Sequence, residues 1–116
     1  PCADWHPRHI ALADWCDVFL VAPCSANTLA KLAHGIADNL LSETALALDS
    51  EKPLLVAPSM NTKMFANLAT QANLEILRGR GVQVLEPDSG DLACGVMGAG
   101  RLPEPEALLT ALEAFA

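Results

Sequence analysis

The sequence predicts an α/β fold in which helices cover both faces of a parallel β-sheet. Three short apolar runs, at residues 17–23, 54–57 and 82–85, have the length and composition of buried strands. Segments with a helical spacing of apolar residues separate these runs, and the connections between them are short. Strands and helices that alternate in this way form parallel strands joined by right-handed crossovers. No internal repeat or linker divides the pattern, so we expect residues 1–116 to form a single domain.

The composition narrows the class of protein before any motif is considered. The chain has 116 residues, of which 52% are hydrophobic, and this content predicts a packed globular domain. Its net charge is -7 without a basic cluster, which argues against nucleic acid as a partner. No apolar run approaches the roughly 20 residues that span a bilayer, so we expect no membrane insertion. The four cysteines lack metal-ligand spacing, which argues against a bound metal or a disulfide scaffold and favours a reducing, cytoplasmic location.

The first half of the chain predicts a helix, a strand, a turn and two further helices. A short helix over residues 9–15 precedes the strand at residues 17–23, which ends at a proline. A small polar turn follows at residues 24–28, and apolar residues then recur at helical spacing over residues 29–36. Residues 38–48 are predicted to continue as a helix that is mostly apolar and buried against the sheet.

The second half of the chain adds two helices and a long loop to the last two strands. A helix over residues 70–80 is predicted to end at Gly81, a residue type that commonly follows a helix. Residues 86–103 are rich in glycine and are predicted as a long loop without secondary structure. Residues 105–115 are predicted as a closing helix, with a proline in its first turn.

Polar turns follow the first and second strands, at the edge where parallel sheets present their chemistry. The turn after the first strand contains small, hydrogen-bonding residues next to a helix N-terminus, which favours polar or anionic ligands. Asn61, after the second strand, offers both a donor and an acceptor and can orient a carboxylate or an amide. Both turns have a structural alternative, because the same side chains are common helix N-caps, Asn61 for a helix beginning near Thr62. The first turn consists of Ser25, Ala26, Asn27 and Thr28.

Two further side chains carry reactive groups. Cys94 lies between small residues on the predicted loop, where a flap could bring its thiol over a ligand as a proton donor or nucleophile. Cys16 and Cys24 flank a predicted buried strand, and we interpret them as structural. His9 can serve as a base near neutral pH, although a single histidine is more often a surface residue. The chain contains no GxGxxG, P-loop, GxSxG or HExxH motif, which argues against the enzyme classes that use them.

Three segments, taken together and in this order, resemble one enzyme family. They are HIALADWCDVFLVAPCSANTLAKLAHGIADNLLS, PSMNTKMF and GDLACGVMGAGRLPEP. They are similar to segments of the flavin-dependent cysteine decarboxylases, above all of the phosphopantothenoylcysteine decarboxylases of coenzyme A biosynthesis. The resemblance extends from His9 to about Pro105 and implies a Rossmann-like, three-layer α/β/α fold of the flavoprotein type.

The resemblance also implies FMN as the cofactor and phosphopantothenoylcysteine as the substrate. In this family the cysteine moiety is oxidised to a thioaldehyde, carbon dioxide leaves, and the remaining ene-thiol is reduced to give phosphopantetheine. His9 is implied as the base of the oxidation step, Asn61 as the ligand of the substrate carboxylate, and Cys94 as the final proton donor. The residues implied to contact FMN are Ser25, Ala26, Asn27, Thr28 and Met60, and those implied to lie close to the substrate are Asp91, Leu92 and Ala93.

Two features depart from the family pattern. The aromatic residue that closes the central motif is usually tryptophan and is Phe65 here, which keeps a ring but loses the indole donor. Family members also begin with a strand and a Gly-Ser loop that cradles the FMN phosphate, and neither is present in this sequence. We therefore expect the chain to contain about the last three strands of a six-stranded sheet, and to bind FMN weakly or not at all by itself.

The resemblance leaves two other functions open and implies an assembly. A decarboxylase of the C-terminal cysteine of a ribosomal peptide shares the histidine and the asparagine. Regulatory homologues without activity typically lose a catalytic residue, whereas His9, Asn61 and Cys94 are all present. Family members form trimers, or dodecamers built from trimers, with active sites between subunits. We therefore expect a homo-oligomer in which His9 acts on a flavin held mainly by a neighbouring chain.

Overall fold

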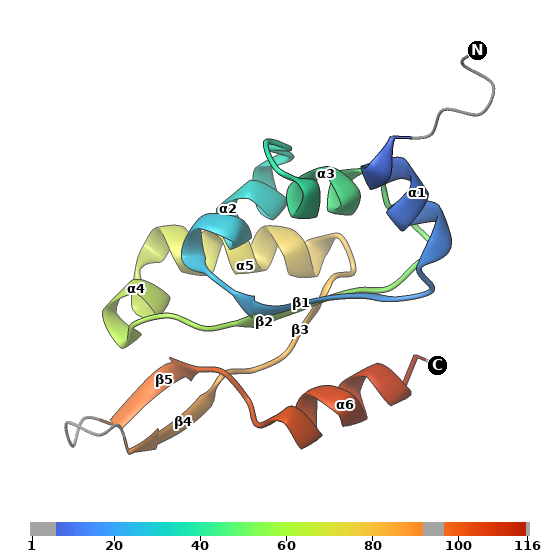
Figure 1. Ribbon diagram of the computed structural model, residues 1–116. Helices are drawn as coiled ribbons and strands as arrows, with labels where there is room; N and C mark the ends of the chain where they lie inside the picture. The colour runs from blue at the N-terminus through green and yellow to red at the C-terminus, as the bar shows by residue number, and fades with distance from the viewer. Residues whose placement is uncertain (1–6, 92–96, 116) are drawn as a thin grey trace, which may run out of the picture.

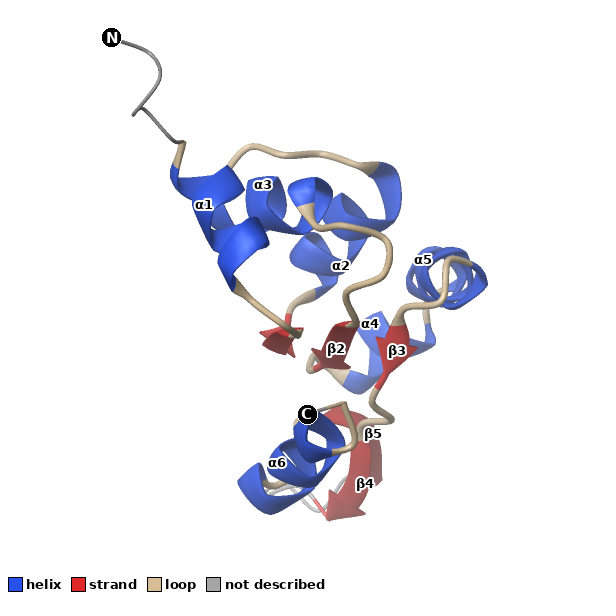
Figure 2. Ribbon diagram, turned by 90° about the vertical axis from the view of Figure 1, so that its right-hand side faces the viewer, coloured by secondary structure: helices blue, strands red, loops and turns tan. Residues whose placement is uncertain are grey.

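The computed structural model describes residues 7–91 and 97–115, which form a layered α/β arrangement around a three-stranded parallel sheet. The sheet has the order β1 (Phe19–Cys24), β2 (Leu54–Pro58) and β3 (Gln83–Val84). Four helices lie on one side of the sheet and α6 (Pro105–Glu113) lies on the other (Figures 1 and 2). The four are α1 (Arg8–Trp15), α2 (Ala26–His34), α3 (Leu40–Ala47) and α5 (Leu68–Gly79). This arrangement confirms the predicted α/β class.

The connections explain why one side of the sheet carries most of the helices. The chain passes from β1 to β2 through α2 and α3, and from β2 to β3 through α4 (Thr62–Ala66) and α5. Both crossovers step in the same direction along the sheet. Crossovers that share their direction and their right-handedness place their helices on the same face. Of these helices, α6 lies on the opposite side because it follows the last strand of the sheet (Figure 2).

The core lies between the strands and the layer formed by α2 and α5. Val56 on β2 packs in one buried cluster with Leu29 of α2 and with Leu74 and Leu77 of α5. Successive strand residues point to opposite faces, so Leu55 points away from this cluster, and it is also fully buried. Burial on both faces explains why the β2 segment is continuously apolar rather than alternating.

The helix ends follow local capping chemistry, and this shifts several predicted boundaries. Helix α2 begins at Ala26 because Ser25 caps it, so the predicted polar turn already contains helical residues. Helix α3 begins at Leu40 rather than near residue 38, because Asn39 and Ser42 form a capping box. Gly81 has a φ of 87° after α5, a left-handed conformation that glycine adopts without strain, as its predicted role requires.

The segment predicted as a loop over residues 86–103 contains a β-hairpin instead. Strands β4 (Asp88–Asp91) and β5 (Met97–Arg101) pair in antiparallel fashion, with Gly90 opposite Gly98. Glycine has low strand propensity and offers no side chain to form an alternating pattern, so sequence periodicity gave no signal here. Backbone pairing forms the hairpin, and the prediction of an unstructured loop was wrong for these two strands.

Candidate functional site at the carboxyl ends of the strands

The turns that follow β1 and β2 meet at the carboxyl edge of the sheet. Cys24 and Pro58 are partners in the strand register, and the backbone N–H of Ser59 donates to the carbonyl oxygen of Cys24 at 3.0 Å. This hydrogen bond joins the turn that begins at Ser25 to the turn that contains Asn61. Helices α2 and α4 consequently start at the same end of the molecule (Figure 1). The fold thus brings together two of the sequence-predicted groups.

Ser25 is the N-cap of α2 and lies exposed at this edge. Its Oγ accepts a hydrogen bond from the backbone N–H of Thr28 at 3.1 Å and lies 3.2 Å from the hydroxyl of Thr28. Asn27 is also exposed, whereas Ala26 and Thr28 are half-buried. Exposed polar side chains at a helix N-terminus provide donors for a polar or anionic group, so the capping role and a ligand role are compatible.

Asn61 is an exposed N-cap as well, on the short helix α4. Its Oδ1 accepts a hydrogen bond from the backbone N–H of Lys63 at 2.8 Å. Asn61 therefore does cap a helix, as the structural alternative predicted. However, the cap uses only the acceptor end of the amide, and the Nδ2 donor end is the part that suits a carboxylate.

Met60 and Phe65 belong to the same turn and short helix as Asn61. Both are half-buried and pack against the main core cluster. The ring at position 65 therefore supports the turn by packing, a role that needs no indole N–H. Met60 lies in the turn after β2, and its contact with a flavin stays a prediction.

The hairpin lies next to α4. Strand β5 contacts α4, whose N-cap is Asn61, and Asp91 is the last residue of β4. The segment between the two strands contains Leu92, Ala93 and Cys94, which lie outside the described residues. Strand β5 therefore lies beside the helix that Asn61 caps, and the roles of Asp91, Leu92, Ala93 and Cys94 stay predictions.

His9 lies away from the two turns within one chain. It belongs to the first turn of α1, which is at the opposite end of the molecule from α4 (Figure 1). Its Nδ1 is 3.2 Å from the Oε2 of Glu43 on α3. Glu43 has no distinguishing feature in the sequence, because a contact between two helices leaves no signal in local spacing.

Cys24 and Cys16 differ in their environments. Cys24 is fully buried, and burial raises the pKa of its thiol to about 12. A thiol with such a pKa stays protonated and unreactive, which agrees with its interpretation as structural. Cys16 is half-buried and its thiol lies 3.6 Å from the carbonyl oxygen of Ala13.

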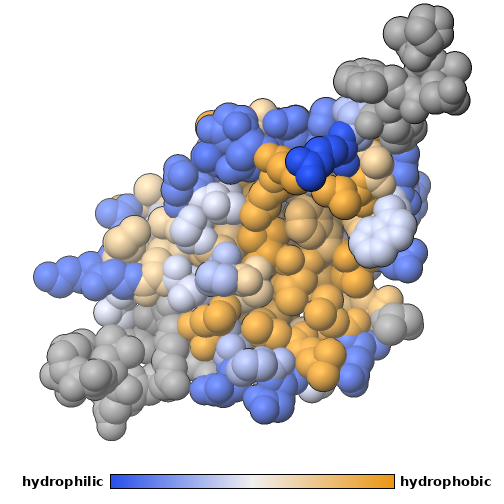
Figure 3. All heavy atoms as spheres, viewed as in Figure 1, coloured by the Kyte–Doolittle hydropathy of each residue, from blue (hydrophilic) through white to orange (hydrophobic). Residues whose placement is uncertain are grey.

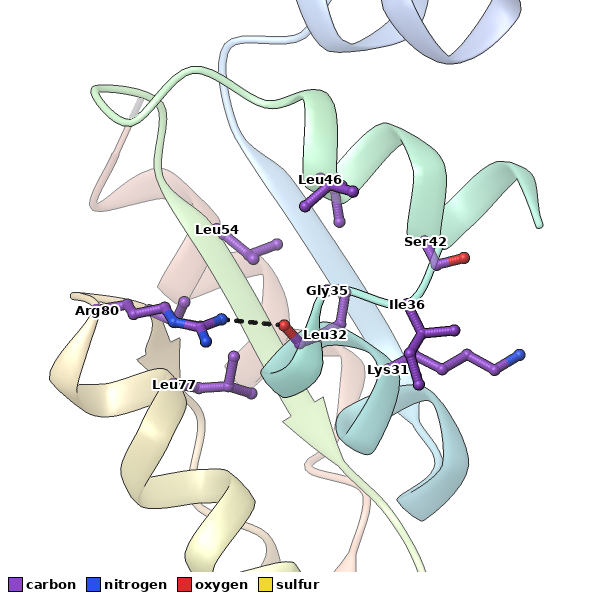
Figure 4. A pocket seen from close by; sticks show the side chains of 11 residues that line it. Lys31, Leu32, Gly35, Ile36, Ser42, Leu46, Leu54, Leu77 and Arg80 are labelled. Atoms are coloured by element: carbon purple, nitrogen blue, oxygen red, sulfur yellow. Dashed lines mark hydrogen bonds between the residues drawn. The ribbon is translucent and has the colours of Figure 1, made fainter. Parts of the chain in front are cut away.

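A hollow on the helical side of the sheet has a structural explanation. It lies between α2, α3 and α5, and it contains none of the predicted site residues (Figure 4). The Arg80 guanidinium crosses it and donates to the carbonyl oxygens of Leu32 and Ala33 at 3.2 and 2.7 Å. These carbonyls belong to the last turn of α2 and lack intrahelical partners, so Arg80 caps that helix.

A second, apolar hollow lies along β1. It has a volume of about 620 Å³ and lies on the side of the molecule where hydrophobic side chains gather (Figure 3). Trp15 on its rim is 79% exposed. The residues that line it are Leu12, Trp15, Cys16, Val18, Phe19, Leu20, Leu40, Leu41 and Thr44. An exposed apolar patch of this kind is typical of a surface that further protein covers.

The chain belongs to the Flavoprotein family, which matches residues 3–116. A relative from Streptococcus mutans, described as a probable phosphopantothenoylcysteine decarboxylase, is 50% identical over 106 residues. That match covers 91% of this chain and 59% of the relative, so the chain spans little more than half of the relative's length. None of the described helices is long and apolar enough to cross a membrane.

Solved structures agree in fold and in the type of protein. A cysteine-to-serine mutant of PPC decarboxylase, complexed with pantothenoylaminoethenethiol, superposes with a TM-score of 0.88 at 40% identity, covering 97% of this chain and 65% of that one. The FMN binding protein AtHal3 superposes with a TM-score of 0.86 at 41% identity, with 97% and 64% coverage. The FMN-dependent cysteine decarboxylase SpaF superposes with a TM-score of 0.74 at 37% identity, covering 96% of this chain and 61% of that one.

Proposed function

We propose that this chain forms part of an FMN-dependent decarboxylase that converts phosphopantothenoylcysteine to phosphopantetheine in coenzyme A biosynthesis. The observation that carries the proposal is the meeting of the Ser25 and Asn61 turns, joined by the Ser59 to Cys24 hydrogen bond. The similarity to a probable phosphopantothenoylcysteine decarboxylase and to the PPC decarboxylase structure supports the substrate. The activity is assigned to the complete flavoprotein domain, of which these residues are proposed to form the last three strands.

The hydrogen-bonding side chains at the carboxyl edge of the sheet suit a flavin cofactor. The Ser25 hydroxyl and the Asn27 amide are exposed at the N-terminus of a nine-residue helix, where donors and the helix dipole favour polar and anionic groups. Residues 25–28 and Met60 are proposed to hold the cofactor. Bound FMN would supply reversible two-electron oxidation of the cysteine moiety, which none of the protein side chains can supply.

The protein side chains would bind the substrate and move its protons. Asn61 would donate through Nδ2 to the substrate carboxylate, with its Oδ1 fixed by the Lys63 N–H. His9 would accept the thiol proton in the oxidation step, and Cys94 would return a proton to the ene-thiol carbon. Asp91, Leu92 and Ala93 would lie beside the substrate. Residues on the hairpin can approach it because β5 contacts α4.

The separation of His9 from Asn61 supports an assembly. If His9 acts in the same reaction, it must act on a site to which another chain contributes the carboxyl edge. We therefore propose a homo-oligomer, a trimer or a dodecamer built from trimers, with sites between subunits. The substrate thiol and the free Cys16 and Cys24 favour a reducing compartment, and we propose the cytoplasm.

The apolar hollow along β1 supports an incomplete domain. The N–H of Phe19 donates to the carbonyl of Pro53, so the backbone groups of Leu20, the next residue, point to the opposite edge. Within the described sheet, that edge of β1 has no strand partner. An additional strand of the flavoprotein domain would pair with this edge and cover the hollow.

A second candidate is decarboxylation of the C-terminal cysteine of a peptide. The similarity to SpaF, an FMN-dependent cysteine decarboxylase, favours keeping it. Both reactions decarboxylate a terminal cysteine, and they differ in whether a phosphopantothenoyl group or a peptide precedes that cysteine. Incubation of the FMN-loaded protein with phosphopantothenoylcysteine and, separately, with a cysteine-terminated peptide distinguishes them by which substrate loses carbon dioxide.

The deciding experiment follows product formation by mass spectrometry in the FMN-loaded protein. We expect the wild type to release phosphopantetheine and Cys94→Ser to accumulate the ene-thiol, because its final protonation stalls. Normal turnover by Cys94→Ser would refute the donor role, and absence of decarboxylation in the wild type would refute the proposed function. For the 116-residue chain alone we expect weak or no FMN binding, and a stoichiometric yellow complex would contradict this.

A further inference from the structure

A side-chain contact between α1 and α3 involves the one histidine that the proposed reaction uses. The Nδ1 of His9 is 3.2 Å from the Oε2 of Glu43, and the two side chains are 32% and 37% exposed. They share the wall of a hollow of about 360 Å³. The other residues of this wall are Ile10, Ala37, Leu46 and Ala47, all of them apolar. The pair is therefore partly shielded on one side and open to solvent on the other.

The geometry determines which ring nitrogen is available. An ionised carboxylate only accepts hydrogen bonds, so the Nδ1 facing Glu43 must carry a proton. In a neutral imidazole the proton then resides on Nδ1, and Nε2 keeps the lone pair. The nitrogen that can accept a substrate proton is thus the one that points away from Glu43.

Glu43 itself is held firmly in place. It lies in the first turn of α3, directly after Ser42, whose side chain and backbone form the capping box with Asn39. Ser42 is 2% exposed. A carboxylate in the first turn of a helix also interacts favourably with the helix dipole. Helices α1 and α3 pack against each other, which fixes the distance between the two side chains.

We propose that Glu43 is a positioning residue for His9, which it keeps in the Nδ1–H tautomer with Nε2 free to accept a proton. This inference rests on the proposed role of His9 as a base. When Nε2 takes the thiol proton, the Glu43 carboxylate stabilises the imidazolium through the Nδ1–H bond. A structural alternative is that the pair only joins α1 to α3.

His34 provides an internal reference with the opposite tautomer. Its Nε2 is 2.9 Å from the Oδ1 of Asn73, an acceptor, so the proton of the neutral ring resides on Nε2. Nitrogen-15 chemical shifts separate a protonated ring nitrogen from one with a lone pair. In the neutral form of both rings, His9 and His34 should therefore give mirrored shift patterns.

The test compares Glu43→Ala with the matched control Glu113→Ala, which removes the same side chain from α6. In the full chain we expect Glu43→Ala to shift the two nitrogens of His9 toward a tautomer mixture, while His34 and the control stay unchanged. In the FMN-loaded decarboxylase we expect kcat to fall about two- to fivefold with KM unchanged, the range that corresponds to exposed ion pairs.

The possible outcomes separate this inference from the proposed function. An unchanged His9 tautomer in Glu43→Ala overturns the positioning role, and so does a tautomer change without a loss of kcat, since the pair is then only structural. Decarboxylation by the wild type tests the proposed function separately, and His9→Ala tests the assignment of His9 as the base. If His9→Ala is inactive while Glu43→Ala is fully active, only the inference fails. If His9→Ala turns over normally, the base assignment fails and the inference with it.

Discussion

Asn61 can be tested for two roles at once, because replacement by aspartate keeps one role and removes the other. Aspartate and asparagine are equally good N-caps, and each offers an oxygen to the backbone N–H of Lys63, which is 2.8 Å from Oδ1. Asn61→Asp should therefore leave the free energy of unfolding within about 0.5 kcal/mol of the wild type. Asn61→Ala removes the acceptor and should cost about 1 kcal/mol.

The ranking of the two variants by decarboxylation activity should be the reverse of their ranking by stability. Loss of a hydrogen bond from the amide to a carboxylate costs about 1.5–3 kcal/mol, or roughly 10- to 150-fold in kcat/KM. Asn61→Ala should show this loss. Asn61→Asp loses the same bond and adds repulsion between two carboxylates, on the order of 1–4 kcal/mol at about 4 Å in a watery to partly buried site. The more stable variant should thus be the less active one, by a further fivefold or more.

Urea unfolding of the chain and steady-state decarboxylation by the FMN-loaded enzyme measure the two effects. Ser59→Ala serves as a control at the same turn, because the hydrogen bond of Ser59 to Cys24 uses its backbone N–H. If Asn61→Asp retained activity within threefold of the wild type, the proposed contact with the substrate carboxylate would be refuted. If Asn61→Ala unfolded at the wild-type urea concentration, the capping contribution would be refuted instead.

Three further predictions concern the fold that supports the site. Arg80→Ala should lower the free energy of unfolding by about 1–3 kcal/mol, because two helix carbonyls lose a charged donor. The control Arg78→Ala breaks only exposed ion pairs and should cost less than about 1 kcal/mol in the same urea titration. Leu74→Ala should cost about 2–5 kcal/mol, since Leu74 is fully buried, and Leu68→Ala, at a site 86% exposed, should stay within about 0.5 kcal/mol. The Cys24 thiol has an ordinary pKa of 9.0 in the unfolded chain, and burial raises its pKa to about 12 in the folded protein. The protonated thiol therefore contributes its full stabilisation below pH 9, and this contribution is lost as the pH rises from 9 toward 12. Cys24→Ala should make the free energy of unfolding less dependent on pH in this range, and an unchanged slope would contradict the assignment.

Local sequence was sufficient to predict the main elements of the fold. The apolar runs that end at Pro23 and Pro58 predicted two of the strands, and Gly81 marked the end of a helix. These features depend on burial, on proline and on glycine conformations, which act over a few residues. The hairpin was not predictable in this way, because glycine-rich strands such as Met97–Arg101 are held by backbone pairing between segments rather than by side-chain pattern.

The sequence by itself determined which chemical groups the protein has and near which strand ends they occur, since a strand followed by a polar turn is a local feature. It placed the Ser25 and Asn61 turns at the same sheet edge, each with a capping alternative. Only the tertiary structure supplied the contact that joins them, through the strand register and the Ser59 to Cys24 hydrogen bond, and showed that His9 lies away from both. The same structure paired His9 with Glu43, 34 positions later, because helix packing and parallel pairing depend on contacts between residues distant in the chain.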